Sequence, residues 1–319
     1  DESMSLGNKV PVYLVNGFLE SGKTTFIQET LSDPYFSDGG KTLLLACEEG
    51  EEEYDLHVLE SYDTELVQVE GKEAFNPEFL EECRKKYKPT QVMIEYNGMW
   101  GMQLFRDMKF PKGWFPAQGI TLVDAGTFDL YMQNMKSLFM DMVQDSDLVI
   151  FNRCVEGTKA ASYKRNIRAV NPRAQVEFEK EGGELFEYED ELPFDLNAEI
   201  VDIGDIDYGI WYVDAMDHPE HYDGKTIRFK ARVMKPRGIT PGYFVPGRRA
   251  MTCCADDTVF LGFLCRSQNV DKLKNGQWLT VTAKVSVQKR EEYSGEEGPV
   301  LYTKALKSAP APEGRLVYF

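Results

Sequence analysis

A glycine-rich stretch near the start of the chain constrains the fold more than any other part of the sequence. An apolar run, Val12–Val15, is followed by Gly17-Phe-Leu-Glu-Ser-Gly-Lys-Thr24 and then by a helical pattern from Thr25 to Leu31. Glycines lack a Cβ, so the backbone can curl and present successive N–H groups to an anion. The start of a helix adds partial positive charge. A strand, this loop and a helix together predict a phosphate-binding P-loop.

The loop residues are expected to hold a nucleoside triphosphate. Lys23 is expected to meet the β and γ phosphates, and the Thr24 hydroxyl to ligate Mg²⁺. The other loop residues expected to line the nucleotide are Gly17, Leu19, Glu20, Ser21, Gly22 and Thr25. A glycine-rich turn that matches by chance is the alternative, and the flanking strand and helix argue against it.

Length, composition and charge predict a two-domain cytoplasmic protein. The 319 residues exceed the usual size of one hydrophobic core, and no apolar run approaches the ~20 residues of a membrane-spanning helix. Six scattered cysteines fit a reducing compartment. Residues 1–199 hold 19 Lys and Arg against 38 Asp and Glu, whereas residues 200–319 hold 17 against 15. The acidic first part disfavours nucleic acid and anionic membranes as partners.

Apolar runs of strand length alternate with helical patterns through the first 180 residues. Strands are expected at Lys41–Cys47, Glu65–Val69, Gln91–Glu95, Ile120–Asp124, Leu148–Phe151 and Gln175–Phe178. Helices are expected at Pro77–Lys86, Ala125–Val143 and Lys159–Val170. This alternation predicts an α/β P-loop NTPase domain, residues 8–180, with a mainly parallel sheet.

The pattern changes after an acidic connector, which we place at residues 181–213. This part of the sequence has no strong helical pattern. Strands are expected at Lys225–Met234, Arg249–Cys254, Val259–Cys265, Gln277–Val287 and Pro299–Leu306. They predict a small all-β, OB-like barrel domain at residues 214–319. The aromatic residues expected to pack the contact between the domains, rather than to stack on nucleic-acid bases, are Tyr208, Trp211, Tyr212 and Tyr243.

Several segments, taken in order, resemble the P-loop GTPases related to the cobalamin-biosynthesis protein CobW, which serve as metallochaperones. They are the P-loop, Glu48–Glu51, Ile94–Gly98, Thr121–Ala125 and Phe151–Arg153. The resemblance covers residues 10–180. Arg249–Asp256 and Gly262 resemble a small domain of unknown function found beside permeases.

The resemblance implies hydrolysis of a nucleotide, with GTP favoured, coupled to delivery of zinc, cobalt or nickel. With Mg²⁺ held at the P-loop, hydrolysis by the chain alone is expected to be slow, because no residue is an evident arginine finger. The resemblance also implies a client protein, either a metalloprotein or a permease, and dimerisation of the chain across the nucleotide face.

Four departures from this family separate the chain from a simple metallochaperone. Glu20 stands where the family has Gly, and we hypothesise that it touches a metal, the attacking water or a partner protomer. The family's Cys-x-Cys-Cys metal motif is absent near Val69–Lys72. Asn152-Arg-Cys-Val155 replaces the guanine-reading Asn-Lys-x-Asp, with Glu156 one position late, so ATP stays open beside GTP. Glu95-Tyr-Asn-Gly98 replaces a Glu-x-x-Gly with small hydroxyl residues.

Carboxylates that follow the strands are the expected metal and water ligands. Glu95 and Glu49, with Thr24, are expected to hold Mg²⁺, and Lys23, Glu49 and Glu95 to form the catalytic set. Glu48 and Glu51 are weaker candidates in the same acidic run. Asp124 is expected either to stand behind the metal site or to cap a helix.

Three further residues are expected to contact the nucleotide. Gly98 is expected at the γ-phosphate in a switch loop. Asn152 is expected at the base edge, and Arg153 to stack on the ring.

His218-Pro-Glu-His221 brings two imidazoles and a carboxylate together. With Asp214, Asp217 or one of Cys253 and Cys254 they form a candidate Zn²⁺ site. Ordinary surface histidines are the alternative. The two adjacent cysteines point to opposite faces of a strand, so both reach one ion only at a bulge.

Two classes of function therefore remain open. In the first, the chain is an NTPase that drives metal handling or assembly of a client protein. In the second, it is a nucleotide-gated module that regulates a partner such as a permease, with little hydrolysis and no metal transfer. The missing Cys-x-Cys-Cys motif favours the second, and the intact P-loop keeps the first.

Overall fold

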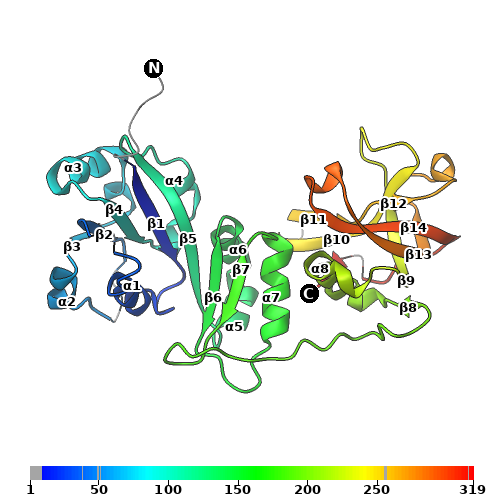
Figure 1. Ribbon diagram of the computed structural model, residues 1–319, viewed down its shortest axis with the longest axis horizontal. Helices are drawn as coiled ribbons and strands as arrows, with labels where there is room; N and C mark the ends of the chain where they lie inside the picture. The colour runs from blue at the N-terminus through cyan, green and yellow to red at the C-terminus, as the bar shows by residue number, and fades with distance from the viewer. Residues whose placement is uncertain (1–8, 38, 49, 51, 255–256, 315) are drawn as a thin grey trace. The chain divides into compact units, whose positions relative to one another are not determined.

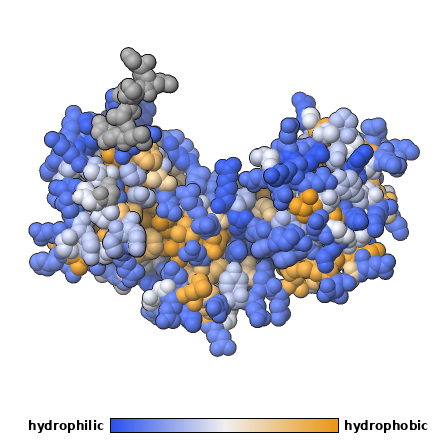
Figure 2. Space-filling view, viewed as in Figure 1, coloured by the Kyte–Doolittle hydropathy of each residue, from blue (hydrophilic) through white to orange (hydrophobic). Residues whose placement is uncertain are grey.

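The chain folds into two compact units (Figure 1). The computed structural model describes residues 9–37, 39–48, 50, 52–254, 257–314 and 316–319, with the side chains of 252–254 and 257 excepted. The first unit comprises Asp1–Ala160 and Val170–Tyr188, and the second comprises Ala161–Ala169 and Glu189–Phe319. None of the described helices has the length and apolar character needed to cross a membrane. Hydrophilic residues cover most of the face seen in Figure 2, with apolar residues gathered in smaller areas.

The first unit is built on a seven-stranded sheet with the strand order β3-β2-β4-β1-β5-β6-β7. Its strands are β1 (Val10–Asn16), β2 (Thr42–Ala46), β3 (Thr64–Gln68), β4 (Gln91–Glu95), β5 (Trp114–Asp124), β6 (Leu148–Asn152) and β7 (Gln175–Phe178). Every pairing in the sheet is parallel. The predicted mainly parallel sheet is therefore confirmed.

The helices between and after these strands follow the sequence pattern. They are α1 (Lys23–Leu31), α2 (Leu56–Ser61), α3 (Pro77–Tyr87), α4 (Gln103–Arg106), α5 (Phe128–Asn134), α6 (Lys136–Gln144) and α7 (Ala160–Val170). The expected single helix at Ala125–Val143 is instead two helices, because Met135 leaves the helical conformation with φ −138° and ψ 32°. Most of α7 belongs to the second unit, where Arg168 pairs with Asp217.

The register of the sheet brings the predicted site residues to one edge. Strand β1 lies between β4 and β5, so the P-loop leaves the sheet where the order of connections reverses, the usual place for a ligand in an open α/β sheet. Glu95 pairs with Val15 across β4 and β1, and Asp124 pairs with Asn152 across β5 and β6. Buried Ile27 and Leu31 of α1 pack in one apolar core with Val15 of β1. That packing fixes the helix that begins at Lys23.

The second unit is mainly an antiparallel β structure. Its strands are β8 (Val201–Asp202), β9 (Thr226–Met234), β10 (Tyr243–Cys254), β11 (Asp257–Gly262), β12 (Cys265–Arg266), β13 (Trp278–Lys289), β14 (Glu297–Ser308) and β15 (Leu316–Val317). The pairing of β9 with β10 closes the path β10-β12-β14-β13-β9 into a ring. A small β domain is thus confirmed, while its OB-like assignment stays a prediction.

Helix α8 (Tyr208–Asp217) begins within the segment that the sequence analysis placed in the connector and was not predicted. Tyr208 and Trp211 are buried in the second unit's own core, where the Trp211 ring stacks on Phe229 at 4.8 Å between centroids. Tyr212 stacks on Phe263 in the same unit.

Tyr243 of β10 packs in the same way inside the second unit, with Leu264 and Val300. These four aromatic residues pack within the second unit, and the expectation that they also pack the contact between the domains stays a prediction.

Candidate functional site

The loop between β1 and α1 has the curled backbone that its glycines predict. Gly17 and Gly22 have φ values of 143° and 92°. A Cβ at Gly17 would lie 2.5 Å from the carbonyl oxygen of Leu122, so no larger residue fits. Glu20 also has a positive φ, 62°, which costs energy for a residue with a side chain. Among the described loop residues with positive φ, Glu20 is therefore the one that carries a side chain in a strained conformation.

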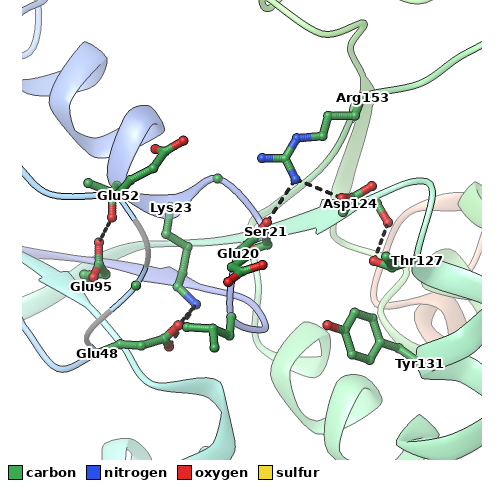
Figure 3. Close-up of a pocket in the computed structure, with 14 residues that line it drawn as sticks. Glu20, Ser21, Lys23, Glu48, Glu52, Glu95, Asp124, Thr127, Tyr131 and Arg153 are labelled. Carbon is green, nitrogen blue, oxygen red and sulfur yellow. Dashed lines mark hydrogen bonds and ion pairs between the residues drawn. The ribbon is translucent and has the colours of Figure 1, made fainter.

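A cavity of about 240 Å³ opens above this loop (Figure 3). The residues that line it are Leu19, Glu20, Ser21, Gly22, Lys23, Thr24, Glu48, Gly50, Glu52, Glu95, Asp124, Thr127, Tyr131 and Arg153. The hydroxyl of Ser21 is buried and has no hydrogen-bond partner among the described residues. This orphaned donor, together with a cradle that a Cβ at Gly17 would fill, fits the binding of an anion such as a phosphate.

Lys23 is buried and points into the loop. Its Nζ donates to the carbonyl oxygens of Gly17 at 2.7 Å and Phe18 at 3.0 Å. It also forms an ion pair with Glu48, 3.0 Å from Oε2. Burial lowers the pKa of Lys23, and the negative charges of Glu48 and Glu95 oppose this effect. Within the described part of the acidic run, Glu48 is thus the carboxylate that meets the P-loop lysine.

Thr24 and Glu95 lie side by side at the start of α1. The Thr24 hydroxyl donates to Glu95 Oε2 at 3.0 Å, and the Tyr54 hydroxyl donates to the same oxygen at 2.5 Å. Glu95 is only 3% exposed. Burial raises the pKa of Glu95, although hydrogen bonds from Tyr54 and Thr24 and the charge of Lys23 oppose the rise. A hydroxyl and a carboxylate are oxygen ligands of the kind that Mg²⁺ prefers.

Sequence reasoning missed Tyr54 and Glu52. Tyr54 follows an acidic run and carries no motif, so its hydrogen bond to Glu95 had no signal in the sequence. Glu52 lines the cavity and accepts a hydrogen bond from the Thr25 hydroxyl. Glu49 and Glu51 lie outside the described residues.

Gly98 lies against the P-loop rather than in the cavity lining. It begins a short 3₁₀ helix, η2 (Gly98–Trp100). A Cβ at Gly98 would lie 2.8 Å from the Gly17 carbonyl oxygen and 2.7 Å from Met142 Sδ. The contact explains why this position is glycine, and it joins the segment after β4 to the phosphate loop.

The far side of the cavity is formed around Arg153. Arg153 Nη1 donates to the Glu20 carbonyl oxygen at 3.0 Å and to Asp124 Oδ2 at 2.8 Å. Asp124 does not cap a helix, since Thr127 is the N-cap residue of α5. Tyr131 lines the same side and packs on Phe18 with 4.2 Å between ring centroids.

Asn152 faces the P-loop instead of the cavity. Its Nδ2 donates to the Ser21 carbonyl oxygen at 2.6 Å, and its Oδ1 is buried with no partner among the described residues. Asn152 therefore holds the backbone of the P-loop just before Lys23 and Thr24. Its own Oδ1 remains available as an acceptor next to the loop.

The zinc candidates are only partly brought together. His218, Glu220 and His221 lie in one short segment, and one ligand atom from each lies within 4.8 Å of the others. Asp214 contacts His221, whereas Asp217 pairs with Arg168. The side chains of Cys253 and Cys254 lie outside the described residues. Cys47, Cys83, Cys154 and Cys265 are buried free thiols.

Comparison with known protein families gives a match for each of the two units. The family described as "CobW/HypB/UreG, nucleotide-binding domain" matches residues 11–178, and the family described as "DUF1980 C-terminal domain" matches residues 184–319. No curated protein sequence matches the chain.

Three solved structures that match part of the chain are GTPases or maturation factors. The hydrogenase maturation factor HypB from Archaeoglobus fulgidus is 16% identical, with 56% of this chain and 84% of that chain covered and a TM-score of 0.40. The Zn(II)-bound YjiA GTPase from E. coli is 22% identical over 53% of this chain and 57% of that chain, with a TM-score of 0.41. HypB from Helicobacter pylori in complex with nickel is 15% identical over 54% and 80%, with a TM-score of 0.37. On the match over residues 11–178, the chain belongs to the CobW/HypB/UreG family of P-loop nucleotide-binding proteins, here joined to a DUF1980 C-terminal domain.

Proposed function

We propose that this protein binds GTP in the P-loop cavity, hydrolyses it slowly, and couples the nucleotide cycle to metal handling for a client protein. The observation that carries the proposal is the placing of Lys23, Thr24 and Glu95 around one cavity of about 240 Å³. Lys23 supplies the positive charge for the phosphates. The buried Ser21 hydroxyl and the backbone N–H groups of the loop supply the remaining donors.

The donor set beside Lys23 fits a hard divalent cation. Thr24 and Glu95 would hold Mg²⁺, which neutralises phosphate charge when bound. Tyr54 fixes the orientation of the Glu95 carboxylate through the same oxygen that Thr24 contacts. Among the described residues that line the cavity, Arg153 is the one arginine, and it is paired with Asp124. Without a free arginine to stabilise the transition state, hydrolysis by the isolated chain is slow.

The base preference follows from the far side of the cavity. Arg153 and Tyr131 offer flat faces to a purine ring, and sequence replaces the guanine-selective carboxylate by Val155. GTP is favoured by the family, and ATP is the competing substrate. Glu20 lines the cavity, and we propose that it touches a metal, the attacking water or a partner protomer.

A second candidate function is a nucleotide-gated regulatory module with little hydrolysis and no metal transfer. The Lys23–Glu48 ion pair and the lack of a cysteine cluster among the described residues favour it. In both cases we propose a cytoplasmic protein with a metalloprotein or a permease as client, and dimerisation across the nucleotide face.

Turnover measurements separate these functions. GTP and ATP hydrolysis is measured with the full chain, with and without Zn²⁺, and Lys23→Ala serves as the blank. GTP hydrolysis above the blank that Zn²⁺ accelerates supports metal handling. Tight nucleotide binding with turnover equal to the blank, indifferent to Zn²⁺, supports the regulatory module. A lack of binding to either nucleotide contradicts both.

A further inference from the structure

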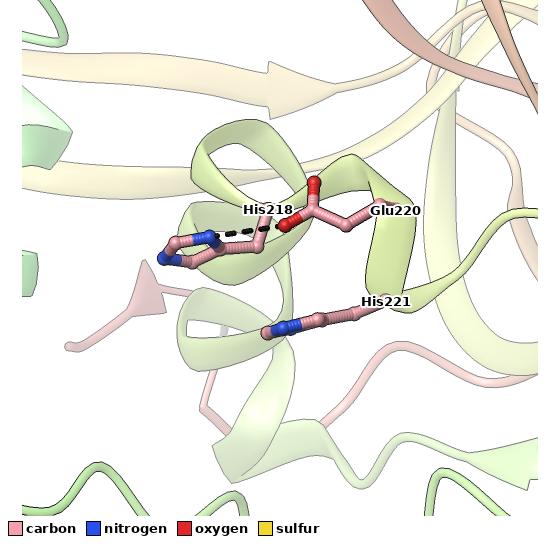
Figure 4. Close-up of side chains that lie close together, drawn as sticks. All are labelled: His218, Glu220 and His221. Carbon is pink, nitrogen blue, oxygen red and sulfur yellow. Dashed lines mark hydrogen bonds and ion pairs between the residues drawn. The ribbon is translucent and has the colours of Figure 1, made fainter.

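The turn that directly follows helix α8 carries two imidazoles and a carboxylate. The 3₁₀ helix η4 (Pro219–His221) follows α8 directly, with His218 as its N-cap residue. Side chains three residues apart eclipse one another in a 3₁₀ helix. His218 and His221 accordingly stack, with 5.0 Å between ring centroids and 22° between ring planes (Figure 4). One ligand atom from each of His218, Glu220 and His221 lies within 4.8 Å of the others.

His221 is held from behind by a buried carboxylate. Asp214 is 8% exposed, and its Oδ2 lies 3.0 Å from His221 Nδ1. The same oxygen accepts a hydrogen bond from the Tyr222 hydroxyl at 2.7 Å. When an imidazole donates its Nδ1–H to a carboxylate, the lone pair of Nε2 is free to bind a metal, and the ring orientation is fixed. Asp214 therefore prepares His221 as a ligand without being one itself.

Asp217, the other acidic residue near this end of helix α8, already has a partner. Asp217 forms its ion pair with Arg168, whose Nε lies 3.0 Å from Oδ1. His218, Glu220 and His221 are exposed, so an ion from solvent reaches all three. The contact of 3.3 Å between His218 Nδ1 and Glu220 Oε1 joins the two groups that a bound cation would draw together.

We propose that His218, Glu220 and His221 bind one Zn²⁺ ion, with Asp214 as the residue that positions His221. Imidazole and carboxylate suit Zn²⁺, and three protein ligands leave one position for water or for a ligand from another molecule. Such an open site exchanges its ion more readily than a closed structural site. The proposal gives the metal handling proposed above a place in the second unit, but it stands on the geometry of this turn and not on the nucleotide site.

The histidine content of the chain makes the site directly testable. The chain has three histidines, and His57 lies exposed on α2 in the first unit. In a Zn²⁺ titration of the metal-free full chain without nucleotide, the ring NMR signals of His218 and His221 should shift and those of His57 should not. Shifts at His57 alone, or at none of the three, would overturn the site. Because no nucleotide is present, this outcome is independent of whether hydrolysis occurs.

Measurements of Zn²⁺ affinity use the same comparison of His218 and His221 with His57. In competition with a chromogenic chelator, His218→Ala and His221→Ala should each lower Zn²⁺ affinity at least roughly tenfold, whereas His57→Ala should not. Equal affinity of all three variants contradicts the proposal. Co²⁺ tests the ligand types: visible absorption without a thiolate charge-transfer band supports histidine and carboxylate ligation. A thiolate band that survives in His221→Ala would place the metal on cysteine instead.

The role of Asp214 is tested by the neighbouring carboxylate. Asp214→Asn should lower Zn²⁺ affinity roughly 10- to 100-fold and change the ring tautomer of His221, as read from its nitrogen chemical shifts. Asp217→Asn, on the same helix but paired with Arg168, is the matched control. Equal affinity and an unchanged tautomer in both variants would remove Asp214 from the site. If Asp214→Asn does not fold, the histidine variants still decide whether the site exists.

Discussion

The ammonium nitrogen of Lys23 lies 3.0 Å from a carboxylate oxygen of Glu48, and the two side chains are only 4% and 9% exposed. Lys23 is the residue that a P-loop directs at phosphate. A bound phosphate and Glu48 therefore compete for one buried cation. Glu48 directly follows strand β2 and Cys47, so the ion pair ties the end of that strand to the phosphate site.

Replacing Glu48 by Gln should tighten nucleotide binding and weaken the protein without nucleotide. Removing the competing charge is expected to lower the Kd for GTP roughly tenfold, or about 1.4 kcal/mol. Without nucleotide, Lys23 loses a charged partner, and the free energy of unfolding should fall by about 1–3 kcal/mol. Calorimetric titration with GTP and thermal unfolding measure the two effects. Glu53→Gln, an exposed residue of the same loop, is the control, and weaker GTP binding in Glu48→Gln would show that Glu48 assists rather than competes.

Glu95 should make the stability of the nucleotide-free protein depend on pH. Its pKa is raised by burial above the ordinary value of 4.5, so the folded protein binds this proton more tightly than the unfolded chain does. The favourable contribution of the protonated form is complete below the unfolded pKa and is lost as pH rises through the folded pKa.

Glu95→Gln should flatten this part of the stability profile. The variant is expected to be more stable than the wild type at neutral pH without Mg²⁺, and the difference should vanish in acid. Denaturant unfolding at a series of pH values measures it, with the exposed Glu82→Gln as control. A Glu95→Gln variant that is less stable than the wild type at neutral pH would instead show that the charge of Lys23 outweighs the burial of Glu95.

The parts of the site that the sequence could predict are those that one residue type dictates. Gly17 is needed because a Cβ there would strike the Leu122 carbonyl, and the motif spacing alone implies such a need. The partner of Lys23 could not be predicted, since Glu48 and its acidic neighbours are chemically equivalent in the sequence. What distinguishes Glu48 from its acidic neighbours is its position in the structure, close to the end of strand β2. Tyr54 had no signal at all, because its bond to Glu95 depends on how the acidic loop returns to the sheet.

The fold also has parts that the sequence could predict and parts that it could not. The parallel sheet follows from apolar runs such as β2, which is buried along its whole length. Helix α8 was missed because apolar residues occur on all its sides, including Tyr208, Trp211 and Val213, so the helical period of an amphipathic helix is absent. The closure of β9 on β10 depends on register between distant segments, which local pattern does not contain.

Glu20 should respond to substitution in two separable ways. Its φ of 62° is a conformation that glycine adopts at no steric cost. Glu20→Gly should therefore raise the free energy of unfolding by about 1 kcal/mol relative to Glu20→Ala, which keeps the strained backbone and loses the charge. Thermal unfolding compares the two variants. GTP turnover, measured on both, reports the carboxylate: equal loss in both assigns Glu20 a role in the reaction, and unchanged turnover in both leaves it without one.

Arg248 and Arg249 are neighbours on β10 with opposite environments, as the alternation of a strand requires. Arg248 is 1% exposed; its guanidinium donates to the Gly314 carbonyl oxygen at 2.9 Å and to Asp205 Oδ1 at 3.1 Å. It also lies 5.6 Å from the centre of the Trp278 ring. Arg249 is exposed.

Arg248→Met should lower the free energy of unfolding of the second unit by about 1.5–3 kcal/mol, because the substitution removes the charged hydrogen bonds that the buried guanidinium donates to Gly314 and Asp205. Arg249→Met, on the same strand, should change it by less than about 0.5 kcal/mol. Denaturant unfolding followed by tryptophan fluorescence measures both, since Trp211 and Trp278 lie in this unit. Equal effects of the two substitutions would mean that Arg248 is no more buried in solution than its neighbour, and that the core of the second unit does not depend on a charged group.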